Sequence, residues 1–321
     1  MTIVRNLFEI ESNLSRAVVT IGNFDGVHLG HRKIFQRVRQ SAREIGGVSV
    51  VITFIPHPLK LLPSRKNIRL ITTYAEKESL IRASGVDYLL NIPFTEEFAN
   101  ISAHDFVTRI LLAKIGMCRL VIGYDYAFGR NREGDVALLR HLGSVLGFEV
   151  EVLEPIGAQG VVYSSSRIRG MIGEGLVREV VSLLGRHFFL DGTIVHGHHR
   201  GKGLGFPTAN LATDNELIPR QGVYAVKVDI GGRLHDGACN IGSNPTFGDG
   251  ETAIEVFVFD FEGDLYGSEI RLYFVERIRD EQKFPDADSL KTVIQADVVR
   301  CREILNMTTV AAYHEDDPGF N

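Results

Sequence analysis

The junction at residues 21–31, IGNFDGVHLGH, constrains the fold more than any other part of this chain. It follows a short apolar run, residues 17–21, that predicts a buried strand, and it leads into HRKIFQRVRQSAREI, whose apolar residues recur at helical spacing. His28 and His31 therefore flank Gly30 at the start of a helix. A helix N-terminus presents free N–H groups and partial positive charge, so the junction predicts a phosphate site. Two imidazoles there would face charge that develops on the phosphate.

Strand-like and helical segments alternate through the first half of the chain. The other strand-like segments lie at residues 48–54, 88–92, 120–122 and 149–153, and helical patterns start at Ala103 and Gly134. Such alternation predicts an α/β domain, with a parallel sheet covered by helices on both faces. Ligands of such sheets bind beyond the carboxyl ends of the strands, and the histidine junction is such a place.

After Leu184 the pattern changes to strand-like segments separated by glycine-rich turns. The segments FFLDGTIV, GVYAVKVDI, EVFVFDF and EIRLYFVERI predict a small antiparallel barrel or sandwich. An amphipathic helix follows at residues 288–305. We therefore expect a first domain at residues 1–184, a second domain at 185–310 and a polar tail at 311–321.

Composition narrows the class of protein. The net charge of −5 and the pI near 6.1 argue against a dedicated nucleic-acid binder, which would present a basic face. No segment resembles a secretory signal or a membrane span. Cys118, Cys239 and Cys301 fit no metal or disulfide spacing, so we expect free thiols in the reducing cytoplasm.

A second phosphate-binding candidate is the serine-rich segment SSSRIR. It follows a loop and opens a helix, with Ser164, Ser165 and Ser166 ahead of Arg167. Hydroxyl groups at a helix start cap its free N–H groups. They can equally bind phosphate oxygens, with Arg167 or Arg169 supplying positive charge. The two roles are compatible.

The segment HGHHRGKGLGFPTANL, residues 196–211, predicts a second nucleotide site. It does not fit the Walker pattern, because a histidine stands where GxxxxGK[ST] needs glycine, yet its glycines allow backbone to approach a phosphate closely. Thr208 and Asn210 face the same way on an extended strand and offer hard oxygen ligands to Mg²⁺. The segment also holds a weak metal motif, to which we assign no metal, at His196, His198 and His199.

Glu255 is the candidate base of the second domain. In IEVFVF it shares one strand face with Phe257 and Phe259. A carboxylate on an aromatic face is costly unless it is paired or functional, and desolvation suits it to accept a proton. The alternative is that this face is the solvent side. For His57, between two prolines, we favour a rigid loop with a satisfied histidine over direct catalysis.

Four motifs of the first half, GNFDGVHLGH, TFIPHP, GYDYAFGRNREGD and SSSRIR, resemble in that order the adenylyltransferase module of bacterial bifunctional riboflavin kinase/FAD synthetases. The resemblance implies an HxGH nucleotidyltransferase that transfers AMP from ATP to FMN and releases pyrophosphate. It implies that His28 and His31 steady the α-phosphate in the transition state. It also implies a nucleotide pocket and a β- and γ-phosphate site, formed respectively by Gly22, Asn23, Phe24 and Asp125 and by Ser164, Ser165 and Arg167. Where the family often has threonine this chain has Ser166, which keeps the hydroxyl.

Five motifs of the second half, LGFPTAN, PRQGVYAV, CNIGSNPTF, FDFEGDLYG and RDEQKF, resemble the riboflavin kinase module of the same family in order and spacing. The resemblance implies a six-stranded flavin-binding barrel that transfers the γ-phosphate of ATP to the ribityl 5′-hydroxyl of riboflavin. It implies Glu255 as the base, Mg²⁺ on Thr208 and Asn210, and a mobile loop near the flavin ring that carries Arg279 and Glu281. The implied ATP contacts are Gly201, Lys202, Gly203, Gly205 and Thr208. Many relatives carry arginine in place of Lys202, so the charge stays but the bidentate fork is lost.

We therefore expect a bifunctional enzyme that makes FMN and then FAD from riboflavin and ATP. We expect small-molecule substrates, no nucleic-acid or membrane partner, and a monomer or weak oligomer. One alternative is a riboflavin kinase whose first domain is only structural, against which the intact HxGH and SSSR segments argue. The other is a non-enzymatic flavin sensor, against which Glu255 argues because binding alone needs no base.

Overall fold

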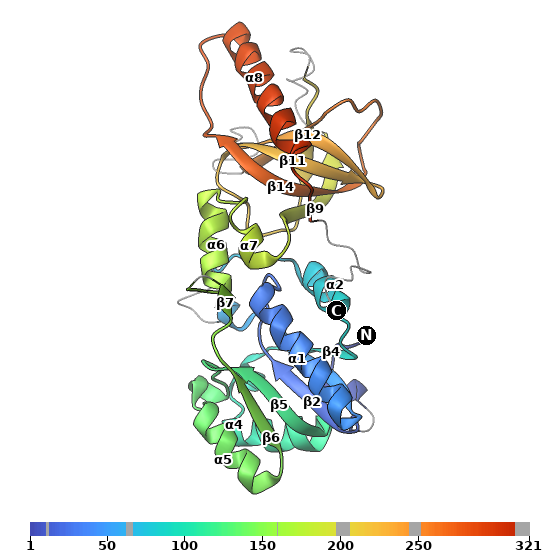
Figure 1. Cartoon of the computed structure of the whole chain (residues 1–321), viewed down its shortest axis with the longest axis vertical. Helices are drawn as coiled ribbons and strands as arrows, with labels where there is room; N and C mark the ends of the chain where they lie inside the picture. Colours follow the sequence, from blue (N-terminus) through green and yellow to red (C-terminus); the bar gives the residue numbers. More distant parts are fainter. Residues whose placement is uncertain (11–12, 62–66, 159, 197–205, 244–251, 312–321) are drawn as a thin grey trace. The chain divides into compact units, whose positions relative to one another are not determined.

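The computed structural model describes residues 1–10, 13–61, 67–158, 160–196, 206–243 and 252–311. This part of the chain forms two compact units (Figure 1), the first ending at Ser165 and the second spanning Ser166–Ala312. Each unit has its own sheet and its own hydrophobic core.

The first unit is built on a six-stranded parallel sheet, which confirms the fold predicted from the alternating segments. Its strand order is β1-β4-β3-β2-β5-β6. The strands are β1 (Thr2–Val4), β2 (Ala17–Ile21), β3 (Val48–Ile55), β4 (Tyr88–Pro93), β5 (Met117–Gly123) and β6 (Glu149–Leu153). The chain runs from β2 through β3 to β4 and then returns to β5 on the other side of β2. The carboxyl end of β2 is therefore the topological switch point, where such sheets bind ligands.

Helices cover both faces of this sheet. They are α1 (Leu29–Ile45), α2 (Tyr74–Ala83), α3 (Glu96–Ala99), α4 (Ala103–Asp105), the π-helix η4 (Phe106–Ile115) and α5 (Val136–Leu146). The shorter elements are η1 (Leu7–Glu9), η2 (Pro58–Lys60), η5 (Arg130–Arg132), β7 (Gly157–Ala158) and β8 (Val161–Val162). Successive strand residues alternate between the two faces of the sheet. Val18 packs with residues of α1 and Val51 with residues of α1 and α2, whereas Val19 and Ile52 pack with residues of η4 and α5.

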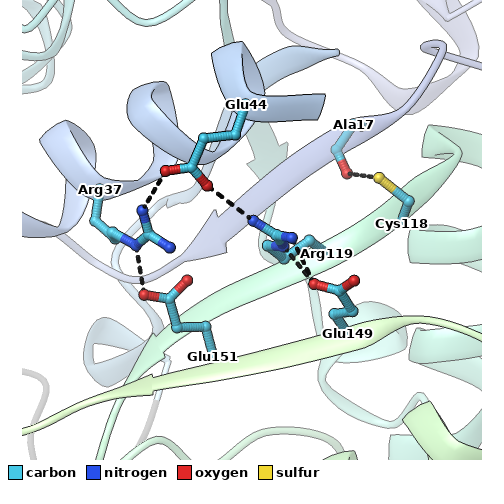
Figure 2. A network of polar contacts seen from close by, with 7 residues as sticks. All are labelled: Ala17, Arg37, Glu44, Cys118, Arg119, Glu149 and Glu151. Atoms are coloured by element: carbon cyan, nitrogen blue, oxygen red, sulfur yellow. Dashed lines mark hydrogen bonds and ion pairs between the residues drawn. The ribbon is translucent and has the colours of Figure 1, made fainter. Parts of the chain in front are cut away.

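A chain of ion pairs joins α1 to the two strands at one edge of the sheet (Figure 2). Arg37 of α1 lies 3.1 Å from Glu44 and 2.5 Å from Glu151 of β6. Arg119 of β5 lies 3.5 Å from Glu44 and 2.6 Å from Glu149 of β6. The hydrogen bond between Arg37 and Glu151 raises the pKa of the Arg37 guanidinium. Alternating charges therefore tie the edge strand to its neighbours.

The second unit contains a closed antiparallel barrel, which confirms the barrel and excludes the sandwich. Its order is β10-β13-β12-β11-β14-β9. The strands are β9 (Phe188–Val195), β10 (Ala209–Ala212), β11 (Gly222–Ile230), β12 (Arg233–Ser243), β13 (Thr252–Val258) and β14 (Glu269–Arg279). Ahead of the barrel lie α6 (Ser165–Glu174) and α7 (Val181–Leu184). The sequence pattern does not predict β12, because RLHDGACNIGS contains two glycines and no apolar run.

The C-terminal helix α8 (Ala287–Asn306) packs across β11, β12 and β14, close to the bounds predicted for it. Its residues Cys301, Ile304 and Leu305 form a core cluster with Ala225 and Phe259.

All three cysteines are free, as expected, and two of them are buried. Burial raises the pKa of both buried thiols, so neither is an activated nucleophile.

Candidate functional sites

The first candidate site is the loop that leaves β2. Phe24 and Val27 adopt φ angles of 49° and 38°, in the left-handed region that bulky side chains rarely enter. The Asp25 carboxylate holds this shape by accepting a hydrogen bond from the backbone N–H of Ile71 at 3.0 Å. Backbone in such conformations persists only where its surroundings fix it, and it concentrates at ligand sites.

His28 and His31 lie together at the N-terminus of α1. His28 is the N-cap, and its Nδ1 accepts a hydrogen bond from the backbone N–H of His31 at 3.3 Å. The two rings stack, with centroids 3.5 Å apart and planes inclined by 21°. Gly30 makes room for this pair, because a Cβ at residue 30 would lie 3.1 Å from the His28 ring. The capping role and the paired imidazoles therefore occur together.

Phe24, which is predicted to line the nucleotide pocket, is buried against neighbouring rings. Its side chain is 4% exposed. Its ring meets the His31 ring edge-on at 5.2 Å and the Phe35 ring at 4.8 Å. Gly22 allows this packing, since a Cβ there would lie 2.8 Å from the Phe24 ring, while Asn23 between them stays half-buried.

The serine segment contacts the histidine loop through Ser165. The Ser165 Oγ donates a hydrogen bond to the backbone carbonyl of Asp25 at 2.9 Å, and Ser164 beside it is half-buried. Asp125 is exposed beyond the carboxyl end of β5, which pairs with β2. Arg167 is exposed on α6 and belongs to the second unit.

His57 has a structural position. It caps η2, with its Nδ1 accepting a hydrogen bond from the backbone N–H of Leu59 at 3.1 Å. The backbone N–H of His57 donates to the hydroxyl of Tyr74 at 3.0 Å, and the residue is 4% exposed. The satisfied histidine that the sequence favours is confirmed.

The second candidate site is a row of residues across the barrel. Asn210 of β10 pairs with Glu255 of β13, and Glu255 pairs with Asn240 of β12. The row continues through Val223 of β11 to Arg279 of β14. Residues directly opposite in antiparallel strands share a face, with Cβ atoms about 4.5–5.5 Å apart. The two amides and the carboxylate therefore form one polar cluster.

The strand face that carries Glu255 is partly covered by α8. Phe257 and Phe259 pack in the α8 cluster, with ring centroids 5.3 Å apart. Glu255, at the next position on the Phe257 face, is half-buried. A half-buried carboxylate at the open end of an aromatic face can both contact a ligand and accept a proton.

Arg279 does not lie on a loop, so that expectation is wrong: it is the last residue of β14. Its guanidinium binds the Asp297 carboxylate of α8, with Nη2 and Oδ2 2.7 Å apart. Glu281 follows the strand, and its carboxylate lies 2.5 Å from where a Cβ would stand at Gly242. The Asn240 amide nitrogen lies 3.3 Å from the same point, so Glu281 reaches the polar row.

The barrel offers hydroxyl, amide and carboxylate oxygens, which are donor types that suit a divalent ion. Thr208 and Asn210 are half-buried, and Asn210 pairs directly with Glu255. In the described ranges no group of three or more His, Cys, Asp or Glu residues could hold a metal ion. His196 stacks on Tyr266, with centroids 4.0 Å apart. The remaining predicted residues of this segment lie outside the described residues: His198, His199, Gly201, Lys202, Gly203 and Gly205.

Sequence reasoning missed two residues that the structure places at these sites. Asn240 lies in the quoted motif CNIGSNPTF, but only the β12 register reveals that it faces Glu255. Lys77 is 4% exposed, and its ammonium donates to the Asn23 carbonyl of the histidine loop at 3.3 Å. A lysine at an otherwise apolar position of α2 is the signal that pattern analysis could have used.

Two family models match the chain: FAD synthetase over residues 10–167 and riboflavin kinase over residues 184–305. The bifunctional riboflavin kinase/FMN adenylyltransferase of Pseudomonas fluorescens is 38% identical over 306 residues, covering 95% of this chain and 98% of the relative. The enzyme of that name from Escherichia coli K12 is 36% identical over 305 residues, covering 93% and 97%.

A solved chain is also similar, described as a macrolide-efflux protein from Streptococcus pneumoniae. It is 34% identical, with a TM-score of 0.85, and the match covers 94% of this chain and 98% of that one. Among the described residues, none of the helices combines the length and the apolar character that crossing a membrane requires. The two family models and the names of the two bifunctional relatives agree with each other.

Proposed function

The chain belongs to the family of bifunctional riboflavin kinase/FMN adenylyltransferases, and on that premise we propose which residues carry each reaction. The enzyme phosphorylates riboflavin to FMN with ATP and transfers AMP from a second ATP to FMN, which gives FAD and pyrophosphate. The observation that carries the assignment is the pair of stacked imidazoles at the N-terminus of α1, separate from the Asn210–Glu255–Asn240 row of the barrel.

Adenylyl transfer takes place at the histidine loop. An oxygen of the FMN phosphate attacks the α-phosphorus of ATP, the bond to the bridging oxygen of the β-phosphate breaks, and pyrophosphate leaves. His28 and His31 stabilise the charge that develops on the α-phosphate, aided by the free N–H groups of α1. Positioning and charge stabilisation suffice, because FMN supplies its own nucleophile.

The remaining groups of this site position the nucleotide. Ser164, Ser165 and Arg167 hold the β- and γ-phosphates through hydroxyl and guanidinium donors. The pocket for the rest of ATP is formed by Gly22, Asn23, Phe24 and Asp125. The contact of Ser165 with the Asp25 carbonyl supports this grouping.

Riboflavin phosphorylation takes place at the polar row of the barrel. Glu255 accepts the proton of the ribityl 5′-hydroxyl as its oxygen attacks the γ-phosphorus, and ADP leaves. Thr208 and Asn210 would hold Mg²⁺, which suits their oxygen donors and the neighbouring carboxylate, and a bound ion would supply positive charge to the phosphates. Gly201, Lys202, Gly203 and Gly205 contribute the phosphate loop, and Arg279 and Glu281 contribute the flavin side.

We also propose a domain division and a cellular setting for the enzyme. The functional modules divide at residues 1–184 and 185–310, with a tail at 311–321. The enzyme works in the cytoplasm on small molecules, as a monomer or weak oligomer.

Separate variants of the two sites test the assignment. The His28→Ala variant is expected to form FMN but no FAD, because it lacks one imidazole of the pair. The Asn210→Ala variant is expected to lose most FMN formation while still converting supplied FMN to FAD. A time course with ATP and Mg²⁺, resolved by chromatography into riboflavin, FMN and FAD, measures both.

Matched controls change the same residue types at exposed positions. His141→Ala on α5 and Asn306→Ala at the end of α8 should leave both activities intact. If either site variant abolished both activities in a folded protein, the assignment to two sites would be wrong. Flavin binding without turnover by the unmodified chain would favour the flavin sensor.

A further inference from the structure

Lys77 is a buried cation that none of the assigned roles uses. It lies in the first turns of α2, and its side chain is 4% exposed. Its neighbours on the same helix, Leu80 and Ile81, are core residues. A charge at such a position is expensive unless it is paired or functional, and buried charges of this kind concentrate at functional sites.

The ammonium of Lys77 is directed at the histidine loop. Its Nζ lies 3.3 Å from the backbone carbonyl of Asn23 and 3.0 Å from the Thr53 hydroxyl at the end of β3. The Thr53 hydroxyl itself donates to the same Asn23 carbonyl at 3.2 Å. Two donors therefore converge on one carbonyl of the loop.

The carbonyl that they hold immediately precedes a residue in the left-handed backbone region. The next residue, Phe24, has a φ of 49°, and its ring packs against the His31 ring. The other side of the bend is held by Asp25, whose carboxylate accepts hydrogen bonds from the segment just ahead of α2. Helix α2 and the segment just ahead of it therefore bind both halves of the loop. The Lys77 ammonium donates to one half, and the Asp25 carboxylate of the other half accepts from the segment.

We infer that Lys77 is a positioning residue of the adenylyl-transfer reaction: its protonated ammonium holds the Asn23 carbonyl, and this sets the bend that places Phe24 against His31. The inference rests on the role proposed above for the two histidines. It assigns Lys77 no contact with ATP or FMN.

The protonation state of Lys77 makes this role measurable. Burial lowers the pKa of Lys77 to about 8, against the opposing influence of Asp25 and Glu78. The groups that face the ammonium are the Asp25 carboxylate from the loop, Glu78 on α2, and the Tyr74 ring, whose centroid is 5.4 Å away. Raising the pH through about 8 removes the proton from Lys77, so kcat/KM for FMN adenylylation should fall on the alkaline side.

The test compares Lys77→Met and Lys77→Arg with the unmodified enzyme. The Met variant keeps the length of the side chain but not its charge, and kcat/KM for adenylylation should fall by about 10- to 100-fold, as for a displaced catalytic group. Its residual activity should lack the alkaline decline. The Arg variant stays protonated at pH 9. The ratio of its activity at pH 9 to its activity at pH 7 should therefore be higher than the same ratio for the unmodified enzyme.

Riboflavin kinase activity of the same chain is the internal control, and it should keep its rate and its pH profile. Arg82→Met, which removes an exposed cation from the same helix, should change neither activity. Thermal unfolding separates positioning from stability: removing one partner of a buried charge costs stability, so kcat/KM of Lys77→Met is measured below its melting temperature, where the variant is folded.

Two results would overturn the inference. One is a Lys77→Met variant that adenylylates FMN within twofold of the unmodified enzyme. The other is an alkaline decline that is unchanged in Lys77→Arg, which decides the matter even where the Met variant fails to fold. Failure of the parent assignment is distinguishable, because His28→Ala would then keep FAD formation at every pH.

Discussion

The two sites of this enzyme are assembled in different ways. The proposed adenylyl-transfer site is centred on one strand-to-helix junction, with Phe24, His28 and His31 inside a single loop and the following helical turn. The proposed kinase site is assembled from residues far apart in the chain, Asn210, Glu255 and Asn240, which the register of three strands brings together. A local site can be recognised in the sequence as one motif. For a site made by strand pairing, the sequence does not reveal which residues lie opposite one another until the strand register is known.

Glu255→Gln tests the barrel site most severely. The substitution keeps the size of the side chain and removes the base, so riboflavin kinase kcat should fall by about 10²- to 10⁴-fold. FMN adenylylation should be unchanged, because the reaction takes place at the other site. Separate assays with riboflavin and with FMN as substrates measure the two rates.

Glu269→Gln, an exposed carboxylate at the start of β14, is the matched control and should leave kinase activity intact. A Glu255→Gln enzyme that still phosphorylates riboflavin within tenfold of the unmodified rate would break the comparison, since the row would then contain no base.

The sequence was sufficient to predict most of the architecture. Alternating segments predicted the parallel sheet, and strand-like segments with glycine-rich turns predicted the barrel, because both follow from local periodicity. The strand β12 escaped prediction because its burial depends on partners on both sides rather than on an apolar run.

The same distinction holds for the site residues. His28 and His31 can be placed together from the sequence because they share one strand-to-helix junction at the carboxyl end of a parallel strand, and the family resemblance implies that Ser165 joins them. Lys77 and Asn240 could not, since each acts on a residue in another element, Asn23 and Glu255. The family resemblance implies a loop position for Arg279, but pairing with Val223 extends β14 to that residue.

Asn240→Ala sharpens the comparison at the residue that sequence reasoning missed. Asn240 lies directly opposite Glu255, and losing its amide should leave the carboxylate less well oriented. We expect kinase kcat/KM to fall by about tenfold, equivalent to about 1.4 kcal/mol of transition-state stabilisation. Adenylylation supplies the internal reference, and Asn306→Ala is again the exposed control. An unchanged kinase would limit the functional row to Asn210 and Glu255.

Arg37→Ala is the smallest of these perturbations, and it separates the site of the first unit from its frame. Arg37 bridges Glu44 and Glu151 at the sheet edge, and its side chain is 29% exposed (Figure 2). Partly exposed ion pairs contribute little, so the free energy of unfolding should fall by about 0.5–1 kcal/mol, and less at high salt. Chemical denaturation at two salt concentrations measures this change.

Adenylylation should be unchanged, because the His28 and His31 geometry depends on the loop after β2 and its contacts with α2, not on β6. A loss of adenylylation larger than the loss of stability would mean that the edge network also orients α1 and, with it, the two histidines.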